Sequence, residues 1–169
     1  MSDPGPQNRI GRILIVEDNP LVACMERSAL HERGFWCDLT VSLREAIHLL
    51  RELQYHLVVL DHDVSDGKGV YLLDWLTQQG IEVPVLYVSS VPPSVSGTAA
   101  QGRRTVRILR KPLDINKLCN EAMEMIPKQS LMSFPSEVTA SERAELFRLL
   151  AESLINDRCY SKIEKAHEQ

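Results

Sequence analysis

Short apolar runs alternate along the chain with segments of helical periodicity. The first run covers residues 13–16 and stops at Glu17, and a second, at 57–60, stops in the same way at Asp61. Unbroken apolar runs of this length are typical of strands that are buried on both faces of a sheet. Further strands are predicted at residues 36–40, 83–88 and 107–110.

Helices are predicted between these strands. Pro20 opens a segment that ends at Gly34, and Ser42 with Glu45 forms a capping box that opens a second helix. Apolar spacing predicts a third helix between Val70 and Gly80 and another from Ile115 to Met125. The first of these helices is inferred from the spacing of Leu21, Val22, Met25 and Leu30. Residues 91–105 predict a loop or a very short helix, because Pro92, Pro93 and Gly97 oppose helix formation.

Strict alternation of strands and helices predicts an α/β fold, with a parallel sheet covered by helices on both faces. Residues 1–9 are polar and rich in Pro and Gly, and we expect a flexible N-terminus there. The α/β domain is expected at 10–127, a linker at 128–138, and a C-terminal helical extension at 139–169, which opens with a second capping box. That extension is expected to cover the domain, pair with a second copy of the chain, or bind a partner.

Composition agrees with one globular domain and a tail. The chain has 169 residues, 44% hydrophobic content and a net charge of −4, so it has no surplus of basic residues to neutralise nucleic-acid phosphates. No apolar run is long enough to span a bilayer, and a cytoplasmic location without membrane contact is expected. Four cysteines without CxxC spacing are interpreted as reduced thiols: Cys24, Cys37, Cys119 and Cys159.

Polar residues follow the predicted strands at one end of the sheet. Ligands of open α/β sheets bind at the carboxyl ends of the strands. Three carboxylates there repel one another, each pair at 4 Å by about 4 kcal/mol at an effective dielectric of 20, so a cation is needed. All-oxygen ligands with open water positions suit Mg²⁺, and a lysine and a hydroxyl beside them suit a phosphoryl group on Asp61. The residues concerned are Glu17, Asp18, Asp61, Ser89 and Lys111.

Four motifs resemble the signatures of response-regulator receiver domains: ILIVEDNP at 13–20, LD at 60–61, VSS at 88–90 and KP at 111–112. The resemblance covers residues 10–127. It implies a flavodoxin-like, doubly wound sheet of five strands in the order 2-1-3-4-5. It also implies a signalling switch rather than a conventional enzyme, controlled by a histidine kinase or histidine phosphotransferase and acting on a downstream protein.

The resemblance also implies a role for each site residue. Asp61 would accept the phosphoryl group, and Ser89 and Lys111 would bind its oxygens. Mg²⁺ would be held by Asp61, by Asp18 with Glu17, and by the main-chain carbonyl of Asp63.

Two positions depart from the family pattern. Ser65 replaces a proline that is common four residues after the phosphoacceptor, which predicts a looser loop. Ile108 stands where many receivers have an aromatic switch residue, so we expect output through an atypical surface. Beside the site, His62 and Asp63 either modulate hydrolysis of the acyl phosphate or are solvated loop residues, and Trp75 is expected to be packed or partly buried.

Parts of the sequence resemble proteins with two other functions. Asp61 to Ser65 resembles the nucleophile motif of haloacid-dehalogenase-like phosphohydrolases, but that family places its metal-binding acidic pair after the lysine. Residues 138–152 faintly resemble the start of a helix-turn-helix, so a vestigial DNA-binding tail is an alternative. The chain ends before a recognition helix is complete, and DNA binding is therefore not expected.

Overall fold

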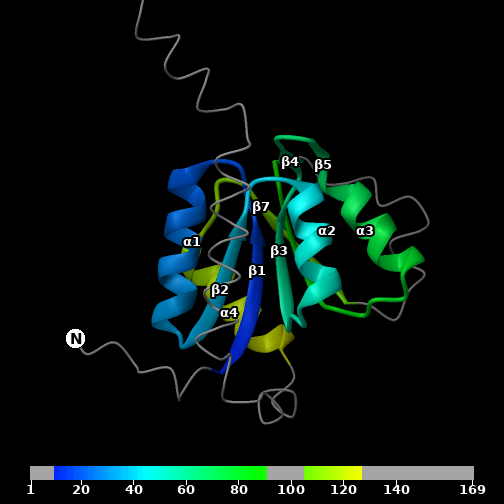
Figure 1. The fold of residues 1–169 in the computed structure, drawn as a ribbon. Coiled ribbons are helices and arrows are strands. Elements are labelled where there is room, and N and C mark those ends of the chain that lie inside the picture. The colour runs from blue at the N-terminus through cyan, green and yellow to red at the C-terminus, as the bar shows by residue number, and fades with distance from the viewer. Residues whose placement is uncertain (1–9, 91–104, 127–169) are drawn as a thin grey trace, which may run out of the picture. The chain divides into compact units, whose positions relative to one another are not determined.

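A computed structural model of the chain describes residues 10–90 and 105–126. Five parallel strands form one sheet (Figure 1), and their spatial order is β2-β1-β3-β6-β7. Counted along the chain, these five strands have the order 2-1-3-4-5, which confirms the flavodoxin-like prediction. They are β1 (Gly11–Val16), β2 (Phe35–Thr40), β3 (Leu57–Asp61), β6 (Val85–Ser89) and β7 (Val106–Arg110).

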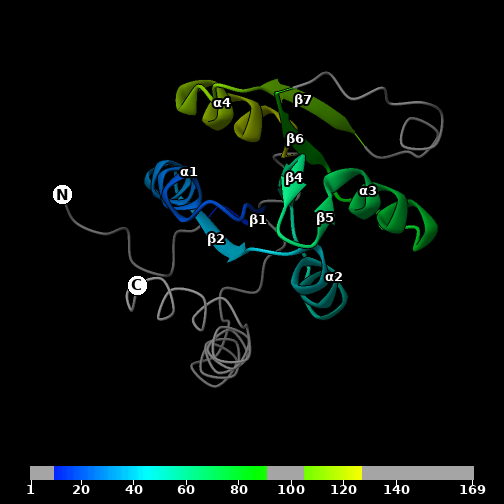
Figure 2. The ribbon, with the colours of Figure 1, turned by 90° about the horizontal axis from the view of Figure 1, so that it is seen from above.

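Helices cover both faces of this sheet, as the alternating pattern predicts. One face carries α1 (Pro20–Glu32) and α4 (Ile115–Met125), and the other carries α2 (Leu43–Glu52) and α3 (Gly69–Gln78) (Figure 2). The central strands of the sheet therefore face helices, not solvent, on both sides. This explains why β1 and β3 are apolar without alternation and are buried at every position.

Helix α1 begins at Pro20, as predicted, but not all of the apolar residues from which it was inferred lie on its buried face. Asn19 caps the helix, since its side-chain oxygen accepts hydrogen bonds from the amides of Leu21 and Val22 at 3.0 and 3.4 Å. Leu21 and Met25, however, are 75% and 57% exposed. The buried face is formed by Ala23, Glu26 and Leu30. Gly34 follows the helix with a φ of 92°, a conformation that favours glycine, as predicted for its end.

A short hairpin that follows β3 was not predicted. It consists of β4 (Asp63–Val64) and β5 (Gly67–Lys68), which pair antiparallel. Ser65 donates from its hydroxyl to the Val41 carbonyl oxygen at 2.7 Å, and Asp66 accepts from the amide of Leu43 at 2.7 Å at the start of α2. The prediction of a looser loop at Ser65 was therefore wrong, because two side chains of the hairpin tie it to the β2–α2 connection.

Several predictions concern residues that lie outside the described ranges. These are the flexible N-terminus at 1–9, the loop or short helix in the 91–104 stretch, the linker at 128–138 and the helical extension at 139–169. Cys159 lies outside them too, whereas Cys24, Cys37 and Cys119 form no disulfide among the described residues. Among the described residues, no helix is both long and apolar enough to cross a membrane.

Candidate functional site

Three carboxylates meet at the carboxyl ends of two neighbouring strands. Glu17 and Asp18 follow β1, Asp61 ends β3, and the two strands pair in parallel up to Val16 and Leu60. Each of the three carboxylates offers one oxygen within 4.8 Å of the others. Glu17 and Asp61 are buried, whereas Asp18 is exposed. This acidic group can hold a divalent metal ion.

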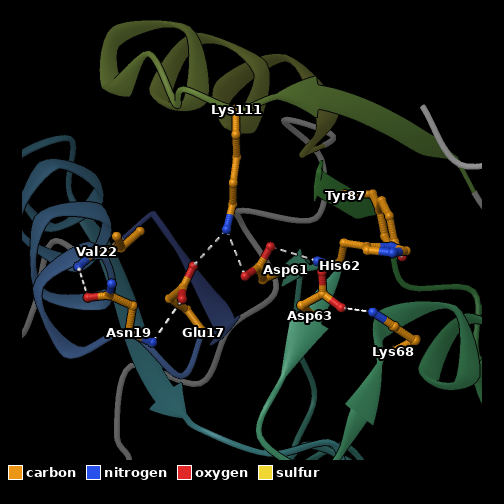
Figure 3. A network of polar contacts seen from close by, with 9 residues as sticks. All are labelled: Glu17, Asn19, Val22, Asp61, His62, Asp63, Lys68, Tyr87 and Lys111. Carbon is orange, nitrogen blue, oxygen red and sulfur yellow. Dashed lines mark hydrogen bonds and ion pairs between the residues drawn. The ribbon is translucent and has the colours of Figure 1, made fainter. Parts of the chain in front are cut away.

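Lys111, directly after β7, reaches the same group across the end of the intervening strand β6. Its Nζ lies 2.8 Å from Asp61 Oδ2 and 3.9 Å from Glu17 Oε2 (Figure 3). Burial disfavours the charged ammonium, but the hydrogen bond and charge of Asp61, with the charge of Glu17, outweigh it and raise the pKa of Lys111. Lys111 therefore stays positively charged beside the carboxylates.

Asp61 has both carboxylate oxygens engaged. Oδ2 binds Lys111, and Oδ1 accepts from the main-chain N–H of His62 at 2.7 Å. The side chain is 5% exposed, so each oxygen of a nearly buried carboxylate accepts from one hydrogen-bond donor. Donors that are already in place can stabilise charge on an oxygen without first being reorganised.

Glu17 is the carboxylate that most needs a cation. Its Oε1 accepts from the amide of Asn19 at 2.9 Å, but its Oε2 is buried without a hydrogen-bond partner. Burial raises the pKa of Glu17, the Asn19 amide opposes this, and the charge of Asp61 adds to the rise. An orphaned oxygen beside two other carboxylates fits a divalent cation, which would satisfy that oxygen and offset the repulsion.

Two other predicted site residues, Ser89 and Asp63, differ in burial: Ser89 is buried and the side chain of Asp63 is exposed. Ser89 is 1% exposed at the end of β6, next to Val88, the partner of Asp61 in the sheet, and its carbonyl accepts from the Lys111 amide at 3.0 Å. Asp63 points its exposed side chain to Lys68, and this ion pair lowers the pKa of the Asp63 carboxyl. The proposed metal ligand there is the main-chain carbonyl, which stays a prediction.

Sequence reasoning missed Glu26, a carboxyl on the buried face of α1. Glu26 is 1% exposed and its Oε2 has no hydrogen-bond partner. Burial, assisted by the charges of Glu17 and Asp61, raises the pKa of Glu26 to about 8. The signal in the sequence is its spacing: with Ala23 and Leu30 it forms an i, i+3, i+7 stripe that helices turn inward.

Sequence reasoning also missed Tyr87, a fully buried residue of β6. Its hydroxyl oxygen lies 2.7 Å from Nδ1 of His62 (Figure 3), and the two rings are edge to face with centroids 5.9 Å apart. In the sheet Tyr87 pairs with Ile108, which is 42% exposed. The family pattern has an aromatic residue at the position of Ile108 on β7. Here the aromatic ring, that of Tyr87, lies on the neighbouring strand β6.

Trp75 is partly buried on α3, as expected, and the guanidinium of Arg51 lies 5.6 Å from the centre of its ring. That contact is of the cation–π kind and joins α2 to α3. Trp75 therefore acts in packing between helices.

The fold and the acidic group together agree with one class of protein, the receiver domains of two-component signalling. Residues 13–123 match the response regulator receiver domain family, and the chain belongs to this family. It is a signalling switch rather than a conventional enzyme, which decides against the phosphohydrolase alternative.

Among its relatives is the transcriptional regulatory protein PmrA of Pectobacterium parmentieri, which is 34% identical over 51% of this chain and 40% of PmrA. A receiver domain (CheY-like) from Methylobacillus flagellatus is 25% identical, with a TM-score of 0.59 over 69% of this chain and 98% of that one. The Francisella response regulator 1452 receiver domain has the same fold, with 22% identity and a TM-score of 0.61 over 68% of this chain and 95% of that one. The chain spans from 35% to 64% of the length of the curated relatives that it matches.

Proposed function

We propose that Asp61 receives a phosphoryl group from the phosphohistidine of a histidine kinase or histidine phosphotransferase. An oxygen of the Asp61 carboxylate attacks phosphorus, the N–P bond of the donor breaks, and an O–P bond forms, which leaves the donor imidazole free. The observation that carries this proposal is the position of Asp61, nearly buried between the Lys111 ammonium and the carboxylates of Glu17 and Asp18.

Each neighbour of Asp61 has a proposed task. Lys111 neutralises charge that develops on the phosphoryl oxygens, and the Ser89 hydroxyl donates a hydrogen bond to one of them. Glu17, Asp18, Asp61 and the carbonyl of Asp63 would hold Mg²⁺. When bound, Mg²⁺ supplies a positive charge that draws electron density from the transferred phosphoryl group.

The charge balance supports a site that gains a cation before it gains an anion. The carboxylates of Glu17, Asp18 and Asp61 lie beside the ammonium of Lys111. When all four groups are ionised, their net charge is −2. A divalent ion brings this sum to zero. Approach of an anionic phosphodonor to the neutralised site then costs less, which predicts that transfer depends on Mg²⁺.

Phosphorylation at Asp61 is proposed to act through protein contacts with a downstream protein or a second copy of the chain. The names of several matched relatives describe transcriptional regulatory proteins. A DNA-binding role is not proposed here, because the residues beyond 126 that resemble a helix-turn-helix carry no basic surplus. The proposed setting is the cytoplasm, where histidine kinases present their phosphohistidine.

The test uses the full chain with Mg²⁺ and acetyl phosphate. We expect a base-labile acyl phosphate on the wild type, and none on Asp61→Asn, in which an amide replaces the attacking carboxylate. Asp74→Asn, a matched change on α3 outside the acidic group, should label like the wild type. Equal labelling of Asp61→Asn and the wild type would refute the proposal.

A further inference from the structure

The Tyr87 hydroxyl occupies one nitrogen of the histidine that follows the phosphoacceptor. His62 Nδ1 lies 2.7 Å from the Tyr87 oxygen, while the main-chain N–H of His62 binds Asp61 Oδ1 at 2.7 Å (Figure 3). His62 is thus connected to Asp61 through its backbone and to Tyr87 through its ring. The ring is directed to Tyr87, away from the carboxylate.

The direction of this hydrogen bond follows from the burial of the hydroxyl. Tyr87 is fully buried, so its own hydroxyl proton needs an acceptor, and Nδ1 lies at hydrogen-bond distance. Burial also raises the pKa of Tyr87 to about 12, with the charges of Asp61 and Asp63 assisting, so the phenol keeps its proton. Tyr87 therefore donates to His62.

Packing holds the Tyr87 ring in this place. A Cβ atom added at Gly69 would lie 3.0 Å from Cε2 of Tyr87 and 3.1 Å from Cγ of Leu60, so glycine is required for the close approach of α3. The amide of Gly69 also donates to the His62 carbonyl at 2.7 Å. His62 and Tyr87 are thus fixed against each other by the strand ends and the start of α3.

The protonation state of a neutral imidazole decides what it can do to water. One nitrogen carries the proton and the other has the lone pair that can accept one. If Tyr87 donates to Nδ1, the proton resides on Nε2 and the only lone pair is occupied. A neutral His62 in this state has no lone pair available to act as a general base.

We propose that Tyr87 is a positioning residue that suppresses hydrolysis of phosphorylated Asp61 by holding His62 as the Nε2–H tautomer. This inference rests on the proposed function of Asp61. In the hydrolysis that it opposes, a water oxygen attacks phosphorus, His62 takes one water proton, and the O–P bond to Asp61 breaks. Asp61 leaves as a carboxylate and the phosphoryl group leaves as inorganic phosphate. Occupying the lone pair of His62 removes the proton acceptor for this step.

The first test measures the decay of phosphorylated Asp61 after removal of acetyl phosphate, in the presence of Mg²⁺. Tyr87→Phe keeps the aromatic ring of residue 87 but releases the imidazole of His62, which can then turn its free lone pair toward the water beside phosphorylated Asp61. We expect decay to be at least ~10-fold faster than in the wild type, at the low end of what a general base contributes. The double variant Tyr87→Phe/His62→Gln should return to the slow decay, since glutamine is no base. Tyr55→Phe is the matched control, because it removes a tyrosine hydroxyl that bonds to Asp38 elsewhere.

Decay of Tyr87→Phe at the wild-type rate would overturn the inference, and so would fast decay that persists in the double variant. A wild type that never labels would refute the proposed function instead, and the inference with it. Labelling and decay are scored separately, so the two failures are distinguishable.

A second test needs no phosphorylation and no variant. The ring ¹⁵N chemical shifts of His62 in the wild type should show an unprotonated Nδ1 and a protonated Nε2. A protonated Nδ1 in the neutral ring would overturn the inference, even if Tyr87→Phe failed to fold.

Discussion

Glu26 should make the stability of the domain fall with rising pH. Its carboxyl is buried on α1 beside the acidic group, and one of its oxygens lacks a hydrogen-bond partner. Because burial raises its pKa to about 8, the folded state keeps a proton that the unfolded chain, with an ordinary value of 4.5, has already lost. The substitution Glu26→Gln removes this titration and keeps the size of the side chain.

The size of the effect follows from the two pKa values. Below about pH 4.5, Glu26 is protonated in both states and its ionisation contributes nothing to the free energy of unfolding. Between 4.5 and about 8, only the unfolded state loses the proton, so the free energy of unfolding falls by ~1.36 kcal/mol per pH unit. Over the full interval the free energy of unfolding falls by about 5 kcal/mol. Between pH 5.5 and 8.0 it falls by about 3 kcal/mol. Above pH 8 the loss levels off.

The assay is urea denaturation at pH 5.5 and 8.0 without divalent metal. Other titrating groups are shared by both proteins, so the difference between wild type and Glu26→Gln isolates Glu26. We expect the wild type to lose about 3 kcal/mol more than Glu26→Gln between the two pH values. Glu52→Gln, an exposed glutamate of α2, should behave like the wild type. An equal pH dependence in wild type and Glu26→Gln would refute the reasoning.

Two further predictions concern local structure. Asn19→Ala removes the side-chain oxygen that caps α1 and should lower the free energy of unfolding by about 1 kcal/mol, whereas the exposed control Asn116→Ala should cost clearly less; equal losses in urea denaturation would contradict the capping role. Gly69→Ala would press a methyl group against the Asp61 carbonyl oxygen and the Tyr87 ring, and should cost about 1 to 3 kcal/mol; a thermal midpoint equal to that of the wild type would show that the close approach is not required.

The parts of the fold that the sequence predicts well are those where burial leaves little choice. β1 and β3 lie at the centre of a sheet covered on both faces, so their positions must be apolar until the strand ends. A carboxylate directly after such a run stands out, which is why Glu17 and Asp61 were found. Their convergence followed from the parallel arrangement of the strands.

Other features depend on contacts between residues that are distant in the sequence. Tyr87 and His62 are 25 positions apart, and no local pattern indicates that the tyrosine hydroxyl meets the imidazole. The hairpin of β4 and β5 has strands of two residues, too short for any periodicity, and is held by Ser65 and Asp66. The spacing of Leu21 and Met25 wrongly indicated a buried face of α1, because apolar residues at helical spacing can also face solvent.

The most direct measurement of the central claim is to locate the acyl phosphate in the chain. Borohydride reduces an aspartyl phosphate to homoserine, which tandem mass spectrometry can assign to a position. After treatment with acetyl phosphate and Mg²⁺, the account predicts homoserine at position 61, and none when Mg²⁺ is removed by a chelator. Intact Asp61 in protein that carries the phosphoryl group at another residue would contradict it.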